Sequence, residues 1–140
     1  MKNIEIKHVS PEYYREILNL EVENSIKHTM AEFLNLESAG LTYLMVSDNT
    51  IEGYSVLLRS MNYWVFNIYE LVVSDNVSTE ELSNFVNLML IEAKKLGCLE
   101  LRYYVDDSNK NVTDALTNNG FAHNQDSDSI SLYVKDIPIK

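Results

Sequence analysis

Glycine, proline and cysteine are scarce in this sequence, with four, two and one respectively in 140 residues. So few Gly and Pro residues leave little room for disordered or low-complexity segments. The single cysteine, Cys98, excludes an internal disulfide framework. Because Cys98 follows Gly97 where a strand is expected to begin, a buried, inert thiol is favoured over a nucleophile. The sequence also lacks an apolar run of about 18 residues, so no transmembrane helix is expected.

Basic residues are also few: 11 Lys and Arg stand against 21 Asp and Glu, which gives a formal net charge of −10. Non-specific affinity for nucleic acid depends on clustered Lys and Arg, so a nucleic-acid partner is not expected, and neither is an anionic membrane surface. The charge suits a cationic ligand or partner, or it simply favours solubility. The N-terminus has no apolar stretch of the signal-peptide type, so a cytoplasmic location is expected.

Potential metal ligands are scattered along the chain. His8, His28 and His123 have no cysteine or carboxylate at ligand spacing, so no metal site is expected. Two short acidic clusters, Asp106-Asp107 and Asp126-Ser127-Asp128, are typical of solvated loops, although they are also suited to recognising a cationic amine.

The hydrophobic pattern predicts a single domain over residues 1–140. Apolar residues with a period of two indicate strands, and a helical period indicates helices. Strands are expected around Ile4 and Ile6 and at residues 41–47, 50–59, 63–73, 99–105 and 130–134, and Asp48-Asn49 is expected to be the turn of a hairpin between the second and third of them. Helices are expected from Ser10-Pro11-Glu12, with Tyr14, Ile17, Leu18 and Val22 on one face, at residues 30–37, at residues 78–96, and from Asn109 to Gly120.

The helix at residues 78–96 has the clearest signals. Ser78 followed by Glu81 is a capping box, and Gly97 ends the helix. One face carries Leu82, Phe85, Val86, Met89, Ala93 and Leu96, and it is widened by Leu88, Leu90 and Ile91. This helix is therefore expected to be mostly buried.

The predicted order is β-α-α-β-β-β-α-β-α-β, a mixed α/β sheet, mostly antiparallel, with helices on both faces. Three motifs stand out within it: Gly53-Tyr54, Glu70-Leu71-Val72-Val73, and Asn109 followed by Gly120-Phe121. This combination is similar to the GNAT superfamily of N-acetyltransferases, over nearly the whole chain. The motifs resemble the family's third strand, the end of its fourth strand, and its fourth-helix pattern.

The resemblance implies that acetyl-CoA lies between the fourth and fifth strands. Backbone groups of Leu71, Val72 and Val73 would hold the pantetheine. The pyrophosphate would bind a loop and helix N-terminus. Asn109 matches an Asn of the family pattern, but an Asn after Asp-Ser is also an ordinary helix cap, and both interpretations stay open.

The pyrophosphate loop of the family has the pattern Q/R-x-x-G-x-G/A, and this sequence departs from it. Ser78, Glu81 and Ser83 occupy the three pattern positions, with Leu82 between the last two. Glu81 places an anionic side chain where a phosphate would approach. Ser78 and Glu81 can also satisfy the N–H groups that would otherwise bind it. The sequence therefore predicts a phosphate site that is lost or remodelled.

Glu70 is the candidate general base, because some members of the family use a Glu on the fourth strand to deprotonate the acceptor amine. A Tyr that often protonates the leaving thiolate is replaced by Leu116. Tyr103 and Tyr104 point to opposite faces of their strand, so one of them is an alternative donor; packing is the other interpretation.

The resemblance implies acetyl transfer from acetyl-CoA to the primary amine of a small molecule or peptide, with a cationic acceptor. The alternative is a non-catalytic GNAT-like binding or regulatory module that does not use acetyl-CoA. Edge strands could pair into a homodimer. An aromatic-rich strand, with Tyr63, Trp64, Phe66 and Tyr69, is expected to pack in the core, to line a substrate groove or to form a dimer surface.

Overall fold

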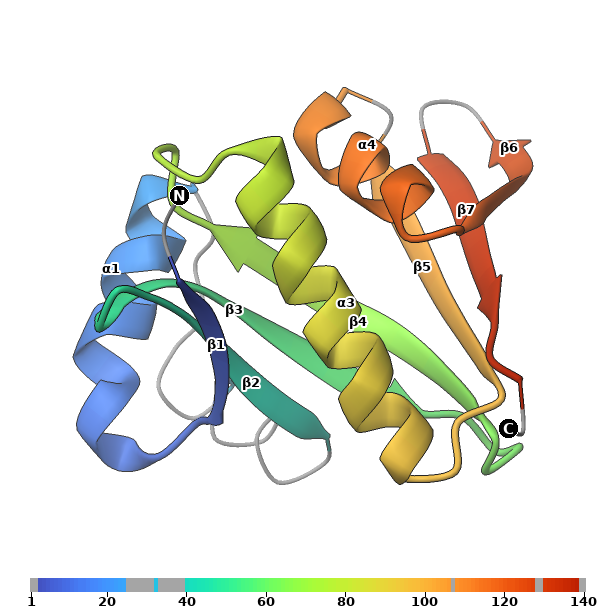
Figure 1. The fold of residues 1–140 in the computed structure, drawn as a ribbon, viewed down its shortest axis with the longest axis horizontal. Coiled ribbons are helices and arrows are strands. Elements are labelled where there is room, and N and C mark those ends of the chain that lie inside the picture. Colours follow the sequence, from blue (N-terminus) through green and yellow to red (C-terminus); the bar gives the residue numbers. More distant parts are fainter. Residues whose placement is uncertain (1–2, 25–31, 33–39, 107, 128–129, 139–140) are drawn as a thin grey trace.

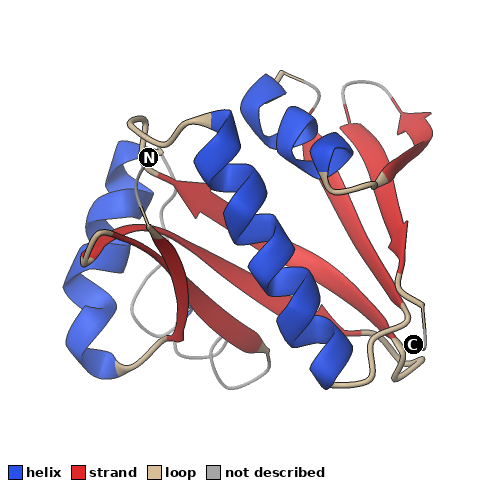
Figure 2. Ribbon diagram, viewed as in Figure 1, coloured by secondary structure: helices blue, strands red, loops and turns tan. Residues whose placement is uncertain are grey.

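The computed structural model describes residues 3–24, 32, 40–106, 108–127 and 130–138. Its centre is a seven-stranded sheet with the strand order β1-β2-β3-β4-β5-β7-β6 (Figure 2). Neighbouring strands are antiparallel except for β4 and β5, which run parallel. The strands are β1 Ile4–His8, β2 Leu41–Ser47, β3 Thr50–Arg59, β4 Val65–Val73, β5 Glu100–Asp106, β6 Ala122–Ser127 and β7 Ile130–Asp136.

Helices cover both faces of this sheet, as the sequence predicts (Figure 1). The helix α1 (Tyr14–Glu23) follows a short 3-10 turn, Pro11–Tyr13, and packs on one face. The helices α3 (Thr79–Lys95) and α4 (Lys110–Asn118) pack on the other. Of the expected helix at residues 30–37, only Glu32 is described, and the rest lies outside the described residues. No helix in the part of the chain that the structure describes is long and apolar enough to cross a membrane.

The helix α3 forms the larger core with the sheet. Its predicted face is confirmed for the residues that are fully buried, Leu82, Phe85, Val86, Met89 and Ala93. The predicted widening of that face is wrong at Ile91, which is 45% exposed, and Leu96 at the C-terminal end is also exposed. The helix therefore presents a normal amphipathic stripe to the sheet and a solvated opposite side.

The predicted face of α1 is confirmed at Ile17, which is buried, and at Tyr14, which packs against the same core, but it is wrong at Val22. Ile17, Leu20 and Glu21 are buried, whereas Val22, which the sequence places on the buried face, is 77% exposed. Neighbouring helical residues point about 100° apart, so Glu21 and Val22 cannot share one direction. The buried direction is taken by Glu21, because its carboxylate accepts a hydrogen bond from Tyr54 of β3.

The strand β6 is absent from the predicted order. Its sequence, Ala-His-Asn-Gln-Asp-Ser, has no apolar alternation, because it lies at the edge of the sheet and pairs with β7 alone. The β2–β3 hairpin is confirmed: Asp48 and Asn49 both have positive φ, as a tight hairpin turn requires. Cys98 is buried, as predicted, and burial raises the pKa of its thiol.

Candidate functional site

The parallel strands β4 and β5 separate part-way along their length. Their ladder runs from the pair Val65 and Glu100 to the pair Ile68 and Tyr103 and then stops. Residues 69–73 of β4 and 104–106 of β5 continue without pairing to one another. Figure 1 shows the two strands leaving the same end of the sheet and diverging towards α3 and α4. We call the space between residues 69–73 and 104–106 the β4–β5 opening.

Two residues of β4 turn their backbone groups towards this opening. The Ser74 N–H donates to the carbonyl of Glu52 in β3, and the Ser55 hydroxyl donates to the carbonyl of Glu70. Since successive residues of a strand point their backbone groups to opposite sides, Leu71 and Val73 point away from β3. The Val73 carbonyl already accepts a hydrogen bond from the Asn24 amide at 3.0 Å. The Leu71 N–H and carbonyl and the Val73 N–H are the groups that the ladder leaves open.

Of the residues predicted to hold a pantetheine, Leu71 and Val73 thus have the required backbone direction, while the backbone of Val72 faces β3. The side chain of Val72 belongs instead to the smaller core, beneath α1. Gly53 lies opposite Val73 on β3, where a Cβ would come within 2.8 Å of the Val72 carbonyl oxygen. The close approach of β3 to β4 therefore requires glycine at this position.

Glu70 belongs to a cluster of three polar side chains that we call the carboxyl cluster: Glu21 of α1, Tyr54 of β3 and Glu70 of β4. The Tyr54 hydroxyl lies 2.8 Å from Glu21 Oε2 and 2.8 Å from Glu70 Oε2. Tyr54 and Glu21 are fully buried, whereas Glu70 is half-buried and is the member that solvent reaches. Burial and then the charge of Glu70 are the largest causes that raise the pKa of Tyr54 far above its ordinary value, so the phenol keeps its proton.

Tyr103 and Tyr104 differ as the strand geometry predicts. Tyr103 is half-buried and packs against the larger core, whereas Tyr104 is 60% exposed on the other face. Burial, and next the charge of Glu70, raise the pKa of Tyr103 to about 12. Tyr103 is therefore protonated at neutral pH and close enough to Glu70 to sense its charge. Leu116 lies fully buried in the larger core, where it packs and cannot donate a proton.

The loop that connects β4 to α3 has its backbone donors occupied. Each of the N–H groups of residues 74–78 has an acceptor within the protein: the Glu52 carbonyl, the Glu23 carboxylate, the Ser74 hydroxyl, the Ser74 carbonyl and the Glu81 carboxylate, in chain order. Two of these acceptors are anionic, which is the kind of acceptor that a bound phosphate would supply.

The predicted capping box is confirmed at the start of α3. Ser78 Oγ accepts from the Glu81 N–H at 3.1 Å, and Glu81 Oε1 accepts from the Ser78 N–H at 3.0 Å. The Glu81 side chain is buried, and Ser47 Oγ also donates to it, at 3.4 Å. Of the first-turn donors, the N–H groups of Thr79 and Glu80 have no partner among the described residues. The loop therefore retains a small part of its capacity to bind an anion.

Polar side chains of α4 connect it to the first half of α3. Asn111 accepts from the Thr79 hydroxyl, and its amide donates to the Val77 carbonyl at 3.2 Å. Ser83 accepts amide hydrogens from Asn118 at its hydroxyl and from Asn119 at its carbonyl. These contacts join α4 to the first half of α3 and to the end of the loop that precedes it.

Asn109 acts as the cap of α4, where its side-chain oxygen accepts from the Val112 N–H at 3.3 Å. The cap interpretation of this residue is thus confirmed, whereas its role towards a cofactor stays a prediction. Leu82, predicted at the same loop, is fully buried in the larger core, and Ser83 is half-buried between α3 and α4. Neither side chain points freely into a phosphate site.

The aromatic residues predicted for one strand are partly buried and partly exposed in the structure. Phe66 is fully buried, whereas Tyr63, Trp64 and Tyr69 are exposed.

Asp106 is exposed at the end of β5, and the Ser108 N–H donates to it, which lowers the pKa of its carboxyl. It behaves as an ordinary solvated turn residue; Asp107 and Asp128 lie outside the described residues. Within the described ranges, no three potential metal ligands gather at one point.

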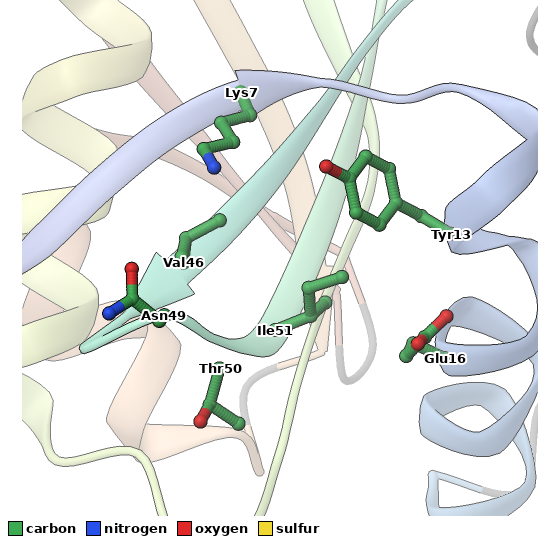
Figure 3. Close-up of a pocket in the computed structure, with 7 residues that line it drawn as sticks. All are labelled: Lys7, Tyr13, Glu16, Val46, Asn49, Thr50 and Ile51. Atoms are coloured by element: carbon green, nitrogen blue, oxygen red, sulfur yellow. The ribbon is translucent and has the colours of Figure 1, made fainter.

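A separate pocket of about 480 Å³ lies between β1, the β2–β3 hairpin and the start of α1 (Figure 3). It is lined by Lys7, Tyr13, Glu16, Val46, Asn49, Thr50 and Ile51. A neighbouring pocket of about 280 Å³ shares Glu16 and Ile51 with it and adds the glutamates Glu23 and Glu52. Neither pocket is lined by a residue of 69–73 or 104–106, so both are distinct from the β4–β5 opening.

Comparison by sequence finds no matching family model and no matching curated protein. Comparison by structure finds close likenesses at low identity. The PaiA N-acetyltransferase from Thermoplasma acidophilum, in complex with coenzyme A, superposes with a TM-score of 0.77 at 17% identity, covering 96% of this chain and 99% of that chain. The chain has the GNAT fold.

Two further GNAT-family acetyltransferases support this assignment. The one from Streptococcus pneumoniae has a TM-score of 0.74 at 15% identity, covering 97% of this chain and all of that chain (100%). The one from Elizabethkingia anophelis, with acetyl-CoA bound, has a TM-score of 0.73 at 13% identity, covering 96% and 99%. The predicted fold class and the predicted GNAT resemblance are therefore confirmed, while these identities by themselves establish the fold alone.

Judged by its own residues, the site fits the two halves of acetyl-CoA unequally. The open backbone groups of Leu71 and Val73 fit an amide-rich pantetheine arm, which needs strand-like partners. The loop fits a pyrophosphate poorly, because its donors are occupied and Glu80 and Glu81 bring negative charge. Glu21 and Tyr54 are site residues that the sequence did not reveal. The sequence singled out the motifs Gly53-Tyr54 and Glu70-Leu71-Val72-Val73 separately, and the structure places them on adjacent strands, with Tyr54 opposite Val72.

Proposed function

We propose that this protein transfers an acetyl group from acetyl-CoA to a primary amine, with weak affinity for the nucleotide half of the donor. The observation that carries the proposal is the position of Glu70. Its half-buried carboxylate lies on β4, next to the residues whose open backbone groups face the β4–β5 opening. An acyl acceptor and an acyl donor can thus meet at one strand.

Acetyl-CoA would supply an activated thioester, and the chain would supply positioning and proton transfer. The Leu71 N–H is an open donor of the kind that polarises a carbonyl oxygen. Glu70 would accept the proton that the amine loses, because a carboxylate within hydrogen-bond reach of the amine can act as a general base. Tyr103, protonated at neutral pH, is the available donor for the departing thiolate, in place of the buried Leu116.

For the acceptor, we infer a cationic amine of a small molecule or peptide. Glu16, Glu23 and Glu52 line the pocket of about 280 Å³ beside α1, and the whole chain has a net charge of −10. Both features favour a positively charged partner over nucleic acid or an anionic membrane. We also infer a cytoplasmic location. A homodimer through the exposed Tyr63, Trp64 and Tyr69 is compatible with this function.

A second candidate function is a non-catalytic GNAT-fold module that binds a protein or small ligand without acetyl-CoA. The specific observation in its favour is the occupation of every N–H group of residues 74–78 by internal acceptors. The hydrogen bonds that Asn111, Asn118 and Asn119 make between α4 and α3 also favour this second candidate, because a ligand that enters between the two helices would have to displace them.

Calorimetric titration with acetyl-CoA separates the two candidates. The variant Ser83→Glu adds a charge between α3 and α4 beside the loop, and Asn84→Glu adds the same charge at the neighbouring exposed position of α3. Under the acetyltransferase proposal, the natural protein binds saturably at micromolar to sub-millimolar concentration, Ser83→Glu weakens binding, and Asn84→Glu changes it much less. A screen of amines for turnover then follows.

No detectable heat at millimolar acetyl-CoA, with folding confirmed by a thermal melt, would exclude the acetyltransferase function and leave the module. Equal weakening by Ser83→Glu and Asn84→Glu would mean that bound ligand responds to overall charge and not to the loop.

A further inference from the structure

The pocket of about 480 Å³ beside the β2–β3 hairpin, which we call the hairpin pocket, lies apart from the β4–β5 opening. Its walls come from three parts of the chain: Lys7 of β1, Tyr13 and Glu16 around the start of α1, and the hairpin residues 46 and 49–51. None of them lies on β4 or β5. A ligand in the hairpin pocket would therefore occupy a second site on the molecule.

The sheet directs Lys7 into this pocket. Ile6, the neighbour of Lys7 in β1, packs against the larger core on the α3 side. Because successive side chains of a strand point to opposite faces, Lys7 points to the face that α1 covers, where Tyr13 packs against the smaller core. Figure 3 shows the Lys7 ammonium and the Tyr13 hydroxyl turned towards the space between them, with Glu16 on the α1 side of the pocket.

The floor of the hairpin pocket is apolar, and a bulge in the hairpin shapes it. The β2–β3 register shifts between Met45 and Val46, which leaves Glu52 as an extra residue of β3. A bulge re-aims the side chains beside it. Val46 lies opposite Ile51, and both side chains line the pocket and contribute to the smaller core. The apolar body of a ligand can therefore lie on Val46 and Ile51.

The charged groups of the hairpin pocket have no partner among the described residues. No hydrogen bond or ion pair from another described residue engages the Lys7 ammonium, the Glu16 carboxylate or the Tyr13 hydroxyl. Elsewhere on the surface such groups do pair, as Lys95 does with Glu92 at 3.1 Å. One cation and one anion thus line the same pocket without forming an ion pair with each other.

The two charges also lie at different ends. Glu16 lines the neighbouring pocket of about 280 Å³ as well, together with Glu23 and Glu52, so negative charge gathers on that side. Lys7 lines the hairpin pocket alone, on the side of β1. A ligand with a single charge would leave one of these ends without a partner, whereas a ligand with one charge of each sign matches both.

We propose that the hairpin pocket binds a small zwitterion, an α-amino acid with an aromatic side chain. Lys7 binds the carboxylate and Glu16 binds the ammonium, and the Tyr13 hydroxyl donates a further hydrogen bond to the carboxylate. The aromatic side chain lies on Val46 and Ile51. Since an apolar cavity of about 150 Å³ already holds benzene, about 480 Å³ has room for a ring and for the charged groups of the amino acid.

The experiment is calorimetric titration of the full chain with phenylalanine and with two analogues that each lack one charge. Phenylpropanoate lacks the ammonium, and phenethylamine lacks the carboxylate. At about 0.15 M salt, long-range repulsion and attraction by the net charge are largely screened. The natural protein is expected to bind phenylalanine saturably and each analogue roughly three- to tenfold more weakly, because one charge-assisted contact at a partly exposed site is lost.

Two variants assign the two ends of the pocket. Lys7→Met should weaken the binding of phenylalanine by roughly three- to tenfold and leave that of phenethylamine unchanged. Glu16→Gln should weaken phenylalanine to the same degree and leave phenylpropanoate unchanged. Arg15→Met and Glu12→Gln are the matched controls, because both residues are exposed nearby and neither lines the pocket. The controls should change each affinity by less than about twofold.

No detectable heat with phenylalanine at millimolar concentration, in protein that a thermal melt shows to be folded, would overturn the proposal. Binding of phenylalanine that neither Lys7→Met nor Glu16→Gln weakens would overturn it too, because the ligand would then lie elsewhere. Both residues are exposed, so both variants are expected to fold. The result is independent of acetyl-CoA: phenylalanine binding without acetyl-CoA binding would retain this site and refute the proposed function, and the opposite pair of results would do the reverse.

Discussion

Two buried tyrosines of the sheet show that a phenolic hydroxyl can stabilise the folded protein at one position and destabilise it at another. Tyr43 and Tyr54 are both fully buried, on neighbouring strands. The Tyr54 hydroxyl lies within hydrogen-bond distance of two carboxyls, whereas the Tyr43 hydroxyl has no hydrogen-bond partner among the described residues. A buried polar group without a hydrogen-bond partner lowers the free energy of unfolding. Removing a buried polar group that has partners lowers it too, because those partners are then left without a hydrogen bond.

The same substitution should therefore have opposite effects at the two positions. Tyr54→Phe is expected to lower the free energy of unfolding by about 1–3 kcal/mol, because two carboxyls lose the group between them. Tyr43→Phe should leave the free energy of unfolding unchanged or raise it. Urea unfolding at neutral pH measures both. A Tyr43→Phe variant destabilised as much as Tyr54→Phe would show that the Tyr43 hydroxyl has a partner after all.

Cys98 leads to a prediction about reactivity. Its thiol is buried and donates to the Glu100 carbonyl at 3.2 Å, and burial raises the pKa of the thiol. Because the thiolate is the reactive form, a raised pKa and low access both slow alkylation. Labelling at about pH 8 should be slow in the folded protein and fast in urea. Rapid and complete labelling without urea would contradict the buried position.

At the scale of elements, the sequence predicted those features whose interacting residues are only a few positions apart. The capping box needs two residues three apart, and it was predicted and is confirmed. The hairpin at Asp48 and Asn49 is equally local. The predicted face of α1 was wrong at Val22, because the burial of the neighbouring Glu21 depends on a residue of another element. The strand β6 was missed because a sheet edge leaves its residues free to be polar.

The N-terminus of α3 is the element whose cap can be tested most directly. Ser78→Ala removes the hydroxyl that accepts from the Glu81 N–H and is expected to lower the free energy of unfolding by about 0.5–2 kcal/mol. Asn84→Ala, at an exposed interior position of the same helix, is the control and should change it by no more than about 0.5 kcal/mol. Equal effects of both variants would mean that the capping box adds nothing to stability.

The sequence predicted only part of the candidate site, because contacts between residues far apart in the sequence leave no local pattern. The altered loop and Glu70 were visible in the sequence because a resemblance to the GNAT pattern fixed their positions. Glu21 and Tyr54 were not, because the three members of the carboxyl cluster come from α1, β3 and β4 and meet only in the folded sheet. The direction of the Leu71 and Val73 backbone also depends on the register of β3 against β4, which no local pattern encodes.

At the scale of the whole molecule, the net charge and the structure of the loop both disfavour the binding of an anionic ligand. The chain has a net charge of −10, and two N–H groups of the loop between β4 and α3 already donate to the carboxylates of Glu23 and Glu81. A conventional phosphate site would attract its ligand through basic residues, and its affinity would fall as salt screens that attraction. Here the long-range field repels an anionic ligand, so the sign of the salt effect should be reversed.

The affinity for acetyl-CoA should therefore rise with salt concentration. Affinity for acetyl-CoA should increase severalfold between about 0.01 M and about 0.15 M salt, as the screening length falls from about 30 Å to about 8 Å. Acetyl-pantetheine, which has the thioester arm without phosphates, is the control and should bind with nearly constant affinity. Calorimetric titration of both ligands measures the difference. An affinity for acetyl-CoA that declines with salt would show that a basic subsite holds the phosphates, and the repelling field inferred from the sequence would not govern binding.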